Sequence, residues 1–188
     1  MQYQDTTRNA STFGRRSALL CIGLIALVAA CDTSHSKTDI DGESSLPDAV
    51  QQQLKQLRDA TEGFERTAAA ESAGYGLVPG LDHCFTNQPL GDMGIHYIDA
   101  AALDLSLDLV HPEAMVYVPD SNGDLVLGAV EYIIPAADWD AEHTELPMLL
   151  GRHLHLNEAL GVYVLHAWIW RENRSGIFED WNPDVHCP

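Results

Sequence analysis

The segment GVYVLHAWIW at residues 161–170 constrains the fold more than any other part of the chain. It is rich in β-branched and aromatic side chains, which is typical of a β-strand. Alternate residues of a strand point to opposite faces, so every second residue from Tyr163 to Ile169 forms one apolar face. The opposite face carries His166, Trp168 and Trp170, a titratable imidazole in line with two indoles. We therefore predict a strand with core on one side and, on the other, a pocket wall formed by the two tryptophans.

A second apolar segment, SALLCIGLIALVAA at residues 17–30, indicates where the protein is located. It is too short to span a bilayer comfortably, and it follows two arginines, which is typical of a signal peptide. It ends LVAAC, which resembles the lipobox at which bacterial lipoproteins are cut and lipidated on the cysteine. An ordinary signal peptide followed by a cysteine is the alternative. We predict a signal peptide over 1–30 and a lipid on Cys31, which would anchor the chain to a membrane of the bacterial cell envelope, facing the periplasm or the exterior.

The cysteines predict one covalent link. Of the four in the chain, two belong to the leader or to its lipid, which leaves Cys84 and Cys187. Two cysteines in an oxidising compartment most simply form a disulfide. The alternative is a metal site that also uses the adjacent His83 and His186, but neighbouring residues rarely reach the same tetrahedral ion. We predict a Cys84–Cys187 disulfide.

The rest of the chain has the length and charge of one acidic domain. Residues 31–45 contain few apolar side chains and predict a flexible tether, and residues 46–188 predict a single domain. Loss of residues 1–30 removes three arginines and one aspartate, which changes the formal charge from −18 to −20. Because nucleic acids are polyanions, we predict no nucleic-acid partner. The sequence identifies no protein partner.

The domain begins with an amphipathic pattern. Apolar residues recur at helical spacing from Val50 to Ala68, with polar residues on the opposite face. Pro47 suits the first turn of a helix, and Gly74 follows the end of the pattern. We predict one long N-terminal helix over residues 47–72.

A β-hairpin is predicted over residues 115–135. Two apolar segments flank DSNGD, in which Asn-Gly suits a type I′ turn. A two-residue turn would pair Ala114 with Glu131 and Val118 with Leu127. Glu131 would then share a strand face with apolar residues, which is costly unless it is paired, protonated, ligating or at a sheet edge. Together these patterns predict an α+β domain, with the long helix on a mostly antiparallel sheet stapled by one disulfide.

Several further segments resemble a family of bacterial secreted proteins and lipoproteins that has no established activity. They are GDMGIHY at 91–97, HPEAMVYVP at 111–119, LVLGAVEYIIP at 125–135, LHLNEALGVYVLHAWIW at 154–170 and FEDWNPDVHC at 178–187. Members typically show GMGxHY, PExLxYxP, VEY, FHxN, LHxWLW and NPxVxC. The resemblance implies that residues 99–112 form a short helix or turn followed by a loop, although leucines alternate over 103–109.

Four polar residues fall on the motif positions of this resemblance: His96, Glu131, His155 and His166. Three imidazoles and a carboxylate would suit zinc, iron or copper, and an open coordination position would permit chemistry on a small molecule. Two other interpretations stay open. The four residues would form a buried structural hydrogen-bond network, or the domain would be a non-catalytic protein-binding module of the envelope. No Gly-x-Ser-x-Gly elbow is present, and the sequence identifies no catalytic residue.

Overall fold

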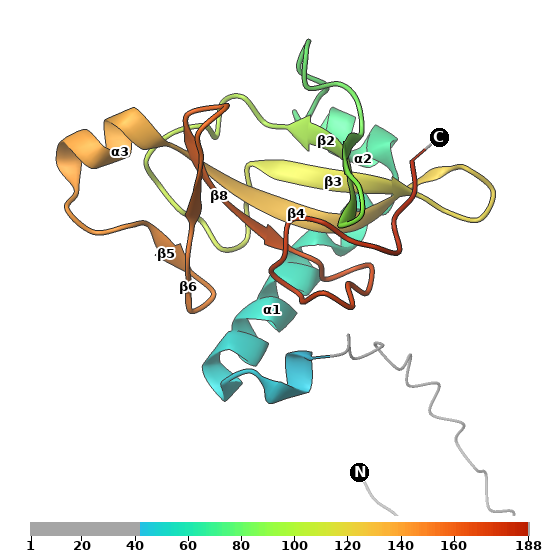
Figure 1. Ribbon diagram of the computed structural model, residues 1–188, viewed down its shortest axis with the longest axis horizontal. Coiled ribbons are helices and arrows are strands. Elements are labelled where there is room, and N and C mark those ends of the chain that lie inside the picture. The colour runs from blue at the N-terminus through green and yellow to red at the C-terminus, as the bar shows by residue number, and fades with distance from the viewer. Residues whose placement is uncertain (1–41, 188) are drawn as a thin grey trace, which may run out of the picture. The chain divides into compact units, whose positions relative to one another are not determined.

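A computed structural model describes residues 42–187 of the chain (Figure 1). The predicted signal peptide, Cys31 and most of the predicted tether lie outside the described residues. The described part is mostly a curled antiparallel β-sheet with short helices, and its six strands have the order β1-β2-β3-β4-β8-β7. None of the described helices is long and apolar enough to cross a bilayer.

The elements follow one another along the chain with short connections. The large sheet contains β1 (Phe85–Asn87), β2 (Gly91–Ile98), β3 (Ala114–Pro119), β4 (Leu125–Pro135), β7 (His155–Asn157) and β8 (Val162–Ala167). A small second sheet contains β5 (Met148–Leu149) and β6 (Arg152–His153). The helical elements are η1 (Glu43–Ser45), α1 (Asp48–Thr61), η2 (Glu62–Phe64), α2 (Thr67–Ser72) and α3 (Ala136–Glu142).

The prediction of an α+β domain with one long N-terminal helix is wrong. The helical pattern is divided between α1 and α2 by the 3-10 turn η2 and an extended Arg66. At the break, the Tyr117 hydroxyl donates to the Phe64 carbonyl at 2.8 Å, and the Leu127 amide donates to the Glu65 carbonyl at 3.0 Å. These carbonyls bond to the sheet instead of to a following helical turn, so tertiary contacts override the helical periodicity.

The sheet has two different faces. On the helix face, residues of β3, β4 and β8 pack against α1, where Leu54 and Leu57 are fully buried. We call the opposite face the cavity face, because a pocket opens on it. There, two smaller apolar clusters lie on either side of His96, Glu131 and His166. The largest apolar cluster therefore lies between the sheet and α1, and the cavity face is free to carry a site.

The β3–β4 hairpin forms, with one irregularity. Ala114 pairs with Glu131, as predicted. The prediction of a two-residue type I′ turn is wrong, because Asn122 lacks the positive φ that it requires and the Asp120 amide donates to the Asp124 carbonyl across the three residues 121–123. A bulge at Gly128 of β4 separates the Val116–Ala129 pair from the next one, so Leu127 pairs with Tyr117 instead of with Val118. As a result, Leu127 joins the core on the helix face and leaves the face that carries Glu131.

Strand β8 is shorter than predicted because the chain turns after Ala167. Tyr163, Leu165 and Ala167 pack on the helix face, as the alternation predicts. Beyond the turn, the indole of Trp170 donates to the Thr61 hydroxyl of α1 at 3.0 Å, away from the strand. The period-2 pattern thus predicts the faces of β8 but not its end.

The predicted disulfide between Cys84 and Cys187 is confirmed, with 6.3 Å between the Cα atoms. It fastens the C-terminal tail next to β2, where Asp92 and Asn182 form an isolated bridge. Gly91 permits this close crossing, because a Cβ atom there would collide with the Asn182 carbonyl. The tail, red in Figure 1, is thereby held over the cavity face.

The end of the predicted tether also belongs to the folded part. Within η1, Glu43 is buried and forms an ion pair with Arg58 of α1. The Arg58 guanidinium also donates to the Ile169 carbonyl at 3.1 Å, which links η1, α1 and the segment after β8. Folded structure therefore begins before residue 46.

Candidate metal centre

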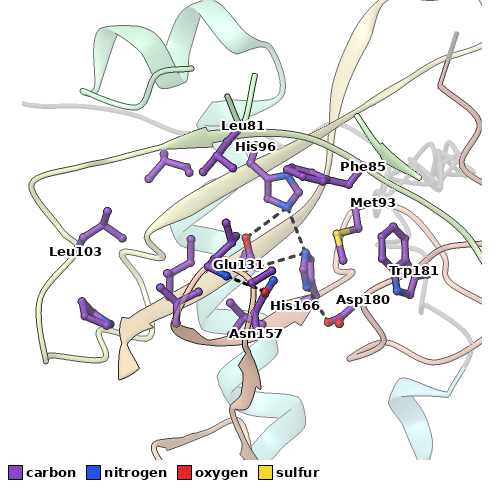
Figure 2. Close-up of a pocket in the computed structure, with 17 residues that line it drawn as sticks. Leu81, Phe85, Met93, His96, Leu103, Glu131, Asn157, His166, Asp180 and Trp181 are labelled. Atoms are coloured by element: carbon purple, nitrogen blue, oxygen red, sulfur yellow. Dashed lines mark hydrogen bonds and ion pairs between the residues drawn. The ribbon is translucent and has the colours of Figure 1, made fainter. Parts of the chain in front are cut away.

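Three of the four suspected polar residues meet on the cavity face. His96 lies on β2, Glu131 on β4 and His166 on β8, and all three are nearly buried. Glu131 and His166 are direct partners in the register of β4 and β8. His96 reaches them across β3, where it pairs with Val116, and Ala114, two residues earlier on the same face, pairs with Glu131. We call His96, Glu131 and His166 the trio (Figure 2).

The spacing within the trio is that of ligands around one ion. The Nε2 atom of His96 lies 3.3 Å from Nε2 of His166 and 3.3 Å from Oε2 of Glu131. The Nε2 atom of His166 lies 3.7 Å from Oε1 of Glu131. Two ligands of a tetrahedral ion with bonds of about 2.0–2.1 Å are about 3.3 Å apart. Two of the three separations match this value and the third is 0.4 Å longer, so the three atoms are spaced to hold one small divalent ion.

Asp180, in the C-terminal tail, orients one imidazole of the trio. The Nδ1 atom of His166 donates to Oδ1 of Asp180 at 3.1 Å, so in the neutral ring the lone pair is on Nε2, toward the other two residues. A carboxylate bonded to the far nitrogen of a histidine is a common support for a metal ligand. Sequence reasoning missed Asp180, although it belongs to the FEDWNPDVHC segment that carries part of the resemblance.

His155 is not a member of the trio. Its Nε2 atom donates to Oδ2 of Asp180 at 2.9 Å, and its side chain is 51% exposed. Asp180 thus stands between His155 and His166 and bonds to both. The predicted ligand set of three imidazoles and a carboxylate is corrected to two imidazoles and a carboxylate, with His155 one residue farther out.

Burial and the neighbouring carboxylates together govern the protonation of the trio. Desolvation, together with the nearby His166, lowers the pKa of His96 to about 3, so this ring is neutral and has a lone pair to offer. Desolvation raises the pKa of the Glu131 carboxyl. For His166, desolvation lowers the pKa, but the Glu131 and Asp180 carboxylates outweigh it and the net shift is upward. A cation between the rings would compensate the buried Glu131 charge.

Asp180 stays ionised in spite of its burial. Desolvation raises its pKa, but the hydrogen bonds from His155 and His166 dominate and hold the pKa far below its usual range. A permanent carboxylate at Nδ1 of His166 fixes the tautomer of that ring and makes Nε2 a better electron donor.

A cavity of about 410 Å³ opens above the trio. Phe85, Met93 and Trp181 close one side of it, and Leu103 lies at the other (Figure 2). Most of the remaining lining is apolar. The trio is therefore the polar floor of an apolar pocket, as expected for a site that binds a small molecule.

The predicted pocket wall of Trp168 and Trp170 is wrong, because neither residue lines the cavity. Trp168 is fully buried in the apolar cluster with Val185, and its indole donates to the Glu179 carbonyl at 2.6 Å. Trp170 turns to α1. The indole at the cavity is that of Trp181, which the tail brings there from outside the strand pattern.

Comparison of the chain with protein-family models, with curated proteins and with solved structures gave no match. The resemblance of its motifs to a bacterial secreted family therefore stays a prediction.

Proposed function

We propose that this protein is a lipid-anchored protein of the bacterial cell envelope that binds a divalent transition metal through His96, Glu131 and His166. The observation that carries the proposal is the spacing of the three ligand atoms, which matches that of a tetrahedral ion. Two imidazoles and a carboxylate are found in zinc enzymes and in non-haem iron sites, and imidazole also suits copper. The tetrahedral spacing favours zinc.

The surroundings of the trio support the same function. Asp180 supplies the outer hydrogen bond that metal-bound histidines commonly make. An ion held by three side chains keeps at least one open coordination position. Because the trio is the floor of the cavity, that position faces the space above it. Such an ion would bind a small molecule or polarise one.

One observation favours a second candidate, a metal-free structural network. Among the described residues, the Nδ1 atom of His96 is buried without a hydrogen-bond partner. A proton on Nε2, directed to Glu131 or His166, would leave only an acceptor unpaired at Nδ1. A metal at Nε2 moves that proton to Nδ1 and leaves an unpaired donor, at a cost of about 1–3 kcal/mol. Metal binding has to exceed this cost.

Cobalt binding distinguishes the two candidates. We expect purified, untagged protein to bind one Co²⁺ per chain with visible d–d bands, and elemental analysis to find one tightly held transition metal. The bands should vanish in His166→Ala and persist in His111→Ala, which removes an exposed histidine outside the cavity. Glu131→Gln keeps the side-chain volume and should weaken binding by about 100-fold or more. If Co²⁺ gives no bands, or if His166→Ala leaves them unchanged, the structural network is correct.

Membrane anchoring is tested separately. Replacing Cys31 with alanine should release the protein from the membrane fraction or leave the leader uncleaved. An unchanged size and unchanged membrane association would contradict the lipoprotein proposal without affecting the metal centre.

A further inference from the structure

We propose that the cavity binds an amphiphile, an unbranched hydrocarbon chain with one oxygen-donor head group that completes the coordination of the metal. The inference rests on the proposed metal centre and names the class of ligand that this centre would take. It is carried by the distribution of polar and apolar side chains along the cavity, by its length and by the exposure of its rim.

The ionisable groups of the cavity are concentrated at one place, and the other polar side chain of its lining, Asn157, already accepts a bond from the Leu160 amide through Oδ1. The ionisable side chains that line it are those of the trio and of Asp180. From Glu131 and His166, the same face of β4 and β8 continues with the pairs Ile133–Val164 and Pro135–Val162. These four residues are apolar and line the cavity. An apolar strip therefore begins at the metal position and runs along the two strands.

The strip has a defined length. Pro135 lies four residues beyond Glu131 on β4, which at about 3.3 Å per residue is about 13 Å. An extended alkyl chain, with bonds of about 1.5 Å, advances about 1.3 Å per carbon. A chain of about ten carbons would therefore reach from the metal to the end of the strip.

The rim at the far end is apolar and open. Leu103 is 39% exposed and lines the cavity on the side away from Phe85 and Trp181 (Figure 2). Leu160, which lies two residues before Val162 in the sequence, also lines the cavity and is 49% exposed. The trio, by contrast, is nearly buried. The ligand would therefore place its head group deep in the protein and the end of its chain at the rim.

The same distribution excludes other ligand classes. A sugar or a nucleotide carries many hydrogen-bonding groups, and desolvating them along the Ile133–Val164 and Pro135–Val162 strip without partners is costly. A polyanion would also meet the Glu131 and Asp180 carboxylates and a formal chain charge of −18. In the proposed ligand, the oxygen-donor head group binds the metal and the hydrocarbon chain packs on the strip.

A homologous series of linear alkyl hydroxamates, from about 2 to about 14 carbons, tests the inference on Co²⁺-loaded protein. The hydroxamate oxygens should bind the ion and shift its d–d bands, and calorimetry gives the affinity of each member. We expect about fourfold tighter binding per added methylene, because each buried methylene gains transfer free energy. The gain should stop at about ten carbons, where the chain leaves the strip.

Variants of the strip supply the controls. Val162→Phe narrows its far end and should stop the gain at a shorter chain, without changing the Co²⁺ spectrum. Leu160→Asn should weaken the longer hydroxamates, whereas Leu146→Asn should not, because Leu146 is equally exposed, at 48%, but does not line the cavity.

The outcomes separate this inference from the proposed metal centre. Normal Co²⁺ bands with an affinity independent of chain length, or a plateau unmoved by Val162→Phe, would overturn the amphiphile and leave the metal centre intact. Absence of Co²⁺ bands would overturn both, because the head group would have no ion to bind.

Discussion

The two faces of the sheet are built from the same strands but differ in how closely they are packed and in how their polar groups are satisfied. On β4, Tyr132 and Ile134 face the helices and are fully buried, whereas Glu131 and Ile133 border the cavity. The Tyr132 hydroxyl donates to the Leu109 carbonyl at 2.7 Å, so the polar atom of this buried side chain is satisfied. On the cavity face, burial raises the pKa of Glu131, and a cavity of about 410 Å³ remains.

This difference indicates which face serves stability and which serves binding. Close packing with satisfied polar groups is the arrangement that stabilises a fold. Unfilled volume beside buried ionisable groups costs stability and is usual at functional sites. The helix face therefore holds the domain together, and the cavity face depends on the disulfide-linked tail to complete it.

The largest effect is expected from breaking that link. Joint replacement of Cys84 and Cys187 by alanine frees a loop with a sequence separation of 103 residues. Chain entropy alone predicts a loss of about 5 kcal/mol in the free energy of unfolding. Because the tail carries Asp180, Co²⁺ affinity should fall as well. Urea unfolding and Co²⁺ titration measure the two effects, and a loss of stability with unchanged Co²⁺ affinity would show that the tail stays in place without the bond.

A matched pair on β4 compares the faces directly. Ile134→Ala removes a fully buried side chain from the helix face and should cost about 3 kcal/mol. Ile133→Ala removes the same atoms beside the cavity and should cost about half as much, because that side chain has fewer packed neighbours to lose. Urea unfolding of both variants gives the comparison. Equal losses would mean that the cavity face is packed as tightly as the helix face.

Much of the sheet could be predicted from local patterns. The two apolar segments around DSNGD predicted the β3–β4 hairpin and its Ala114–Glu131 pair, although the turn has three residues instead of two, and the alternation in β8 predicted its core face. Cysteine counting predicted the disulfide. These features depend on residues near one another in the sequence or on a simple count, and a period of two is hard to mistake.

The failures have tertiary causes. The helix breaks at η2 because Tyr117 and Leu127 bond to its carbonyls, and no local pattern reports bonds to distant strands. The prediction that Trp168 lines the cavity fails because β8 ends at Ala167, before the alternation reaches that residue. Asp180 and Trp181 reach the cavity on a tail without periodicity, whose position depends on the disulfide. The residues of the trio were predicted from motif positions. Asp180 and Trp181 were not predicted, because they come near the trio only when the tail folds against the sheet.

A pH-dependent loss of stability is expected from Glu113, which immediately precedes β3. Burial raises the pKa of this carboxyl to about 7 from an ordinary value of 4.5, even though the Ile133 amide donates to it at 3.0 Å. A raised pKa means that the fold favours the protonated form, so stability is fully present below about pH 4.5 and is lost as pH rises through about 7. The loss amounts to about 3 kcal/mol. Urea unfolding at several pH values should show this slope in the wild type and a flatter one in Glu113→Gln, and parallel slopes would contradict the assignment.

The smallest effect separates binding from structure within the cavity face. Asp180→Asn keeps the side-chain volume but loses the charge that makes His166 a better ligand, so Co²⁺ affinity should fall about 10–100-fold. His155→Ala removes the other hydrogen-bond partner of Asp180 and should change the affinity much less, because Asp180 keeps its bond to His166. Competition with a chelator of known affinity measures both variants. If Asp180→Asn binds Co²⁺ as tightly as the wild type, Asp180 only fastens the tail to the sheet. If both variants weaken binding equally, His155 and Asp180 support His166 as one unit, and the functional part of the cavity face extends to the exposed imidazole at its edge.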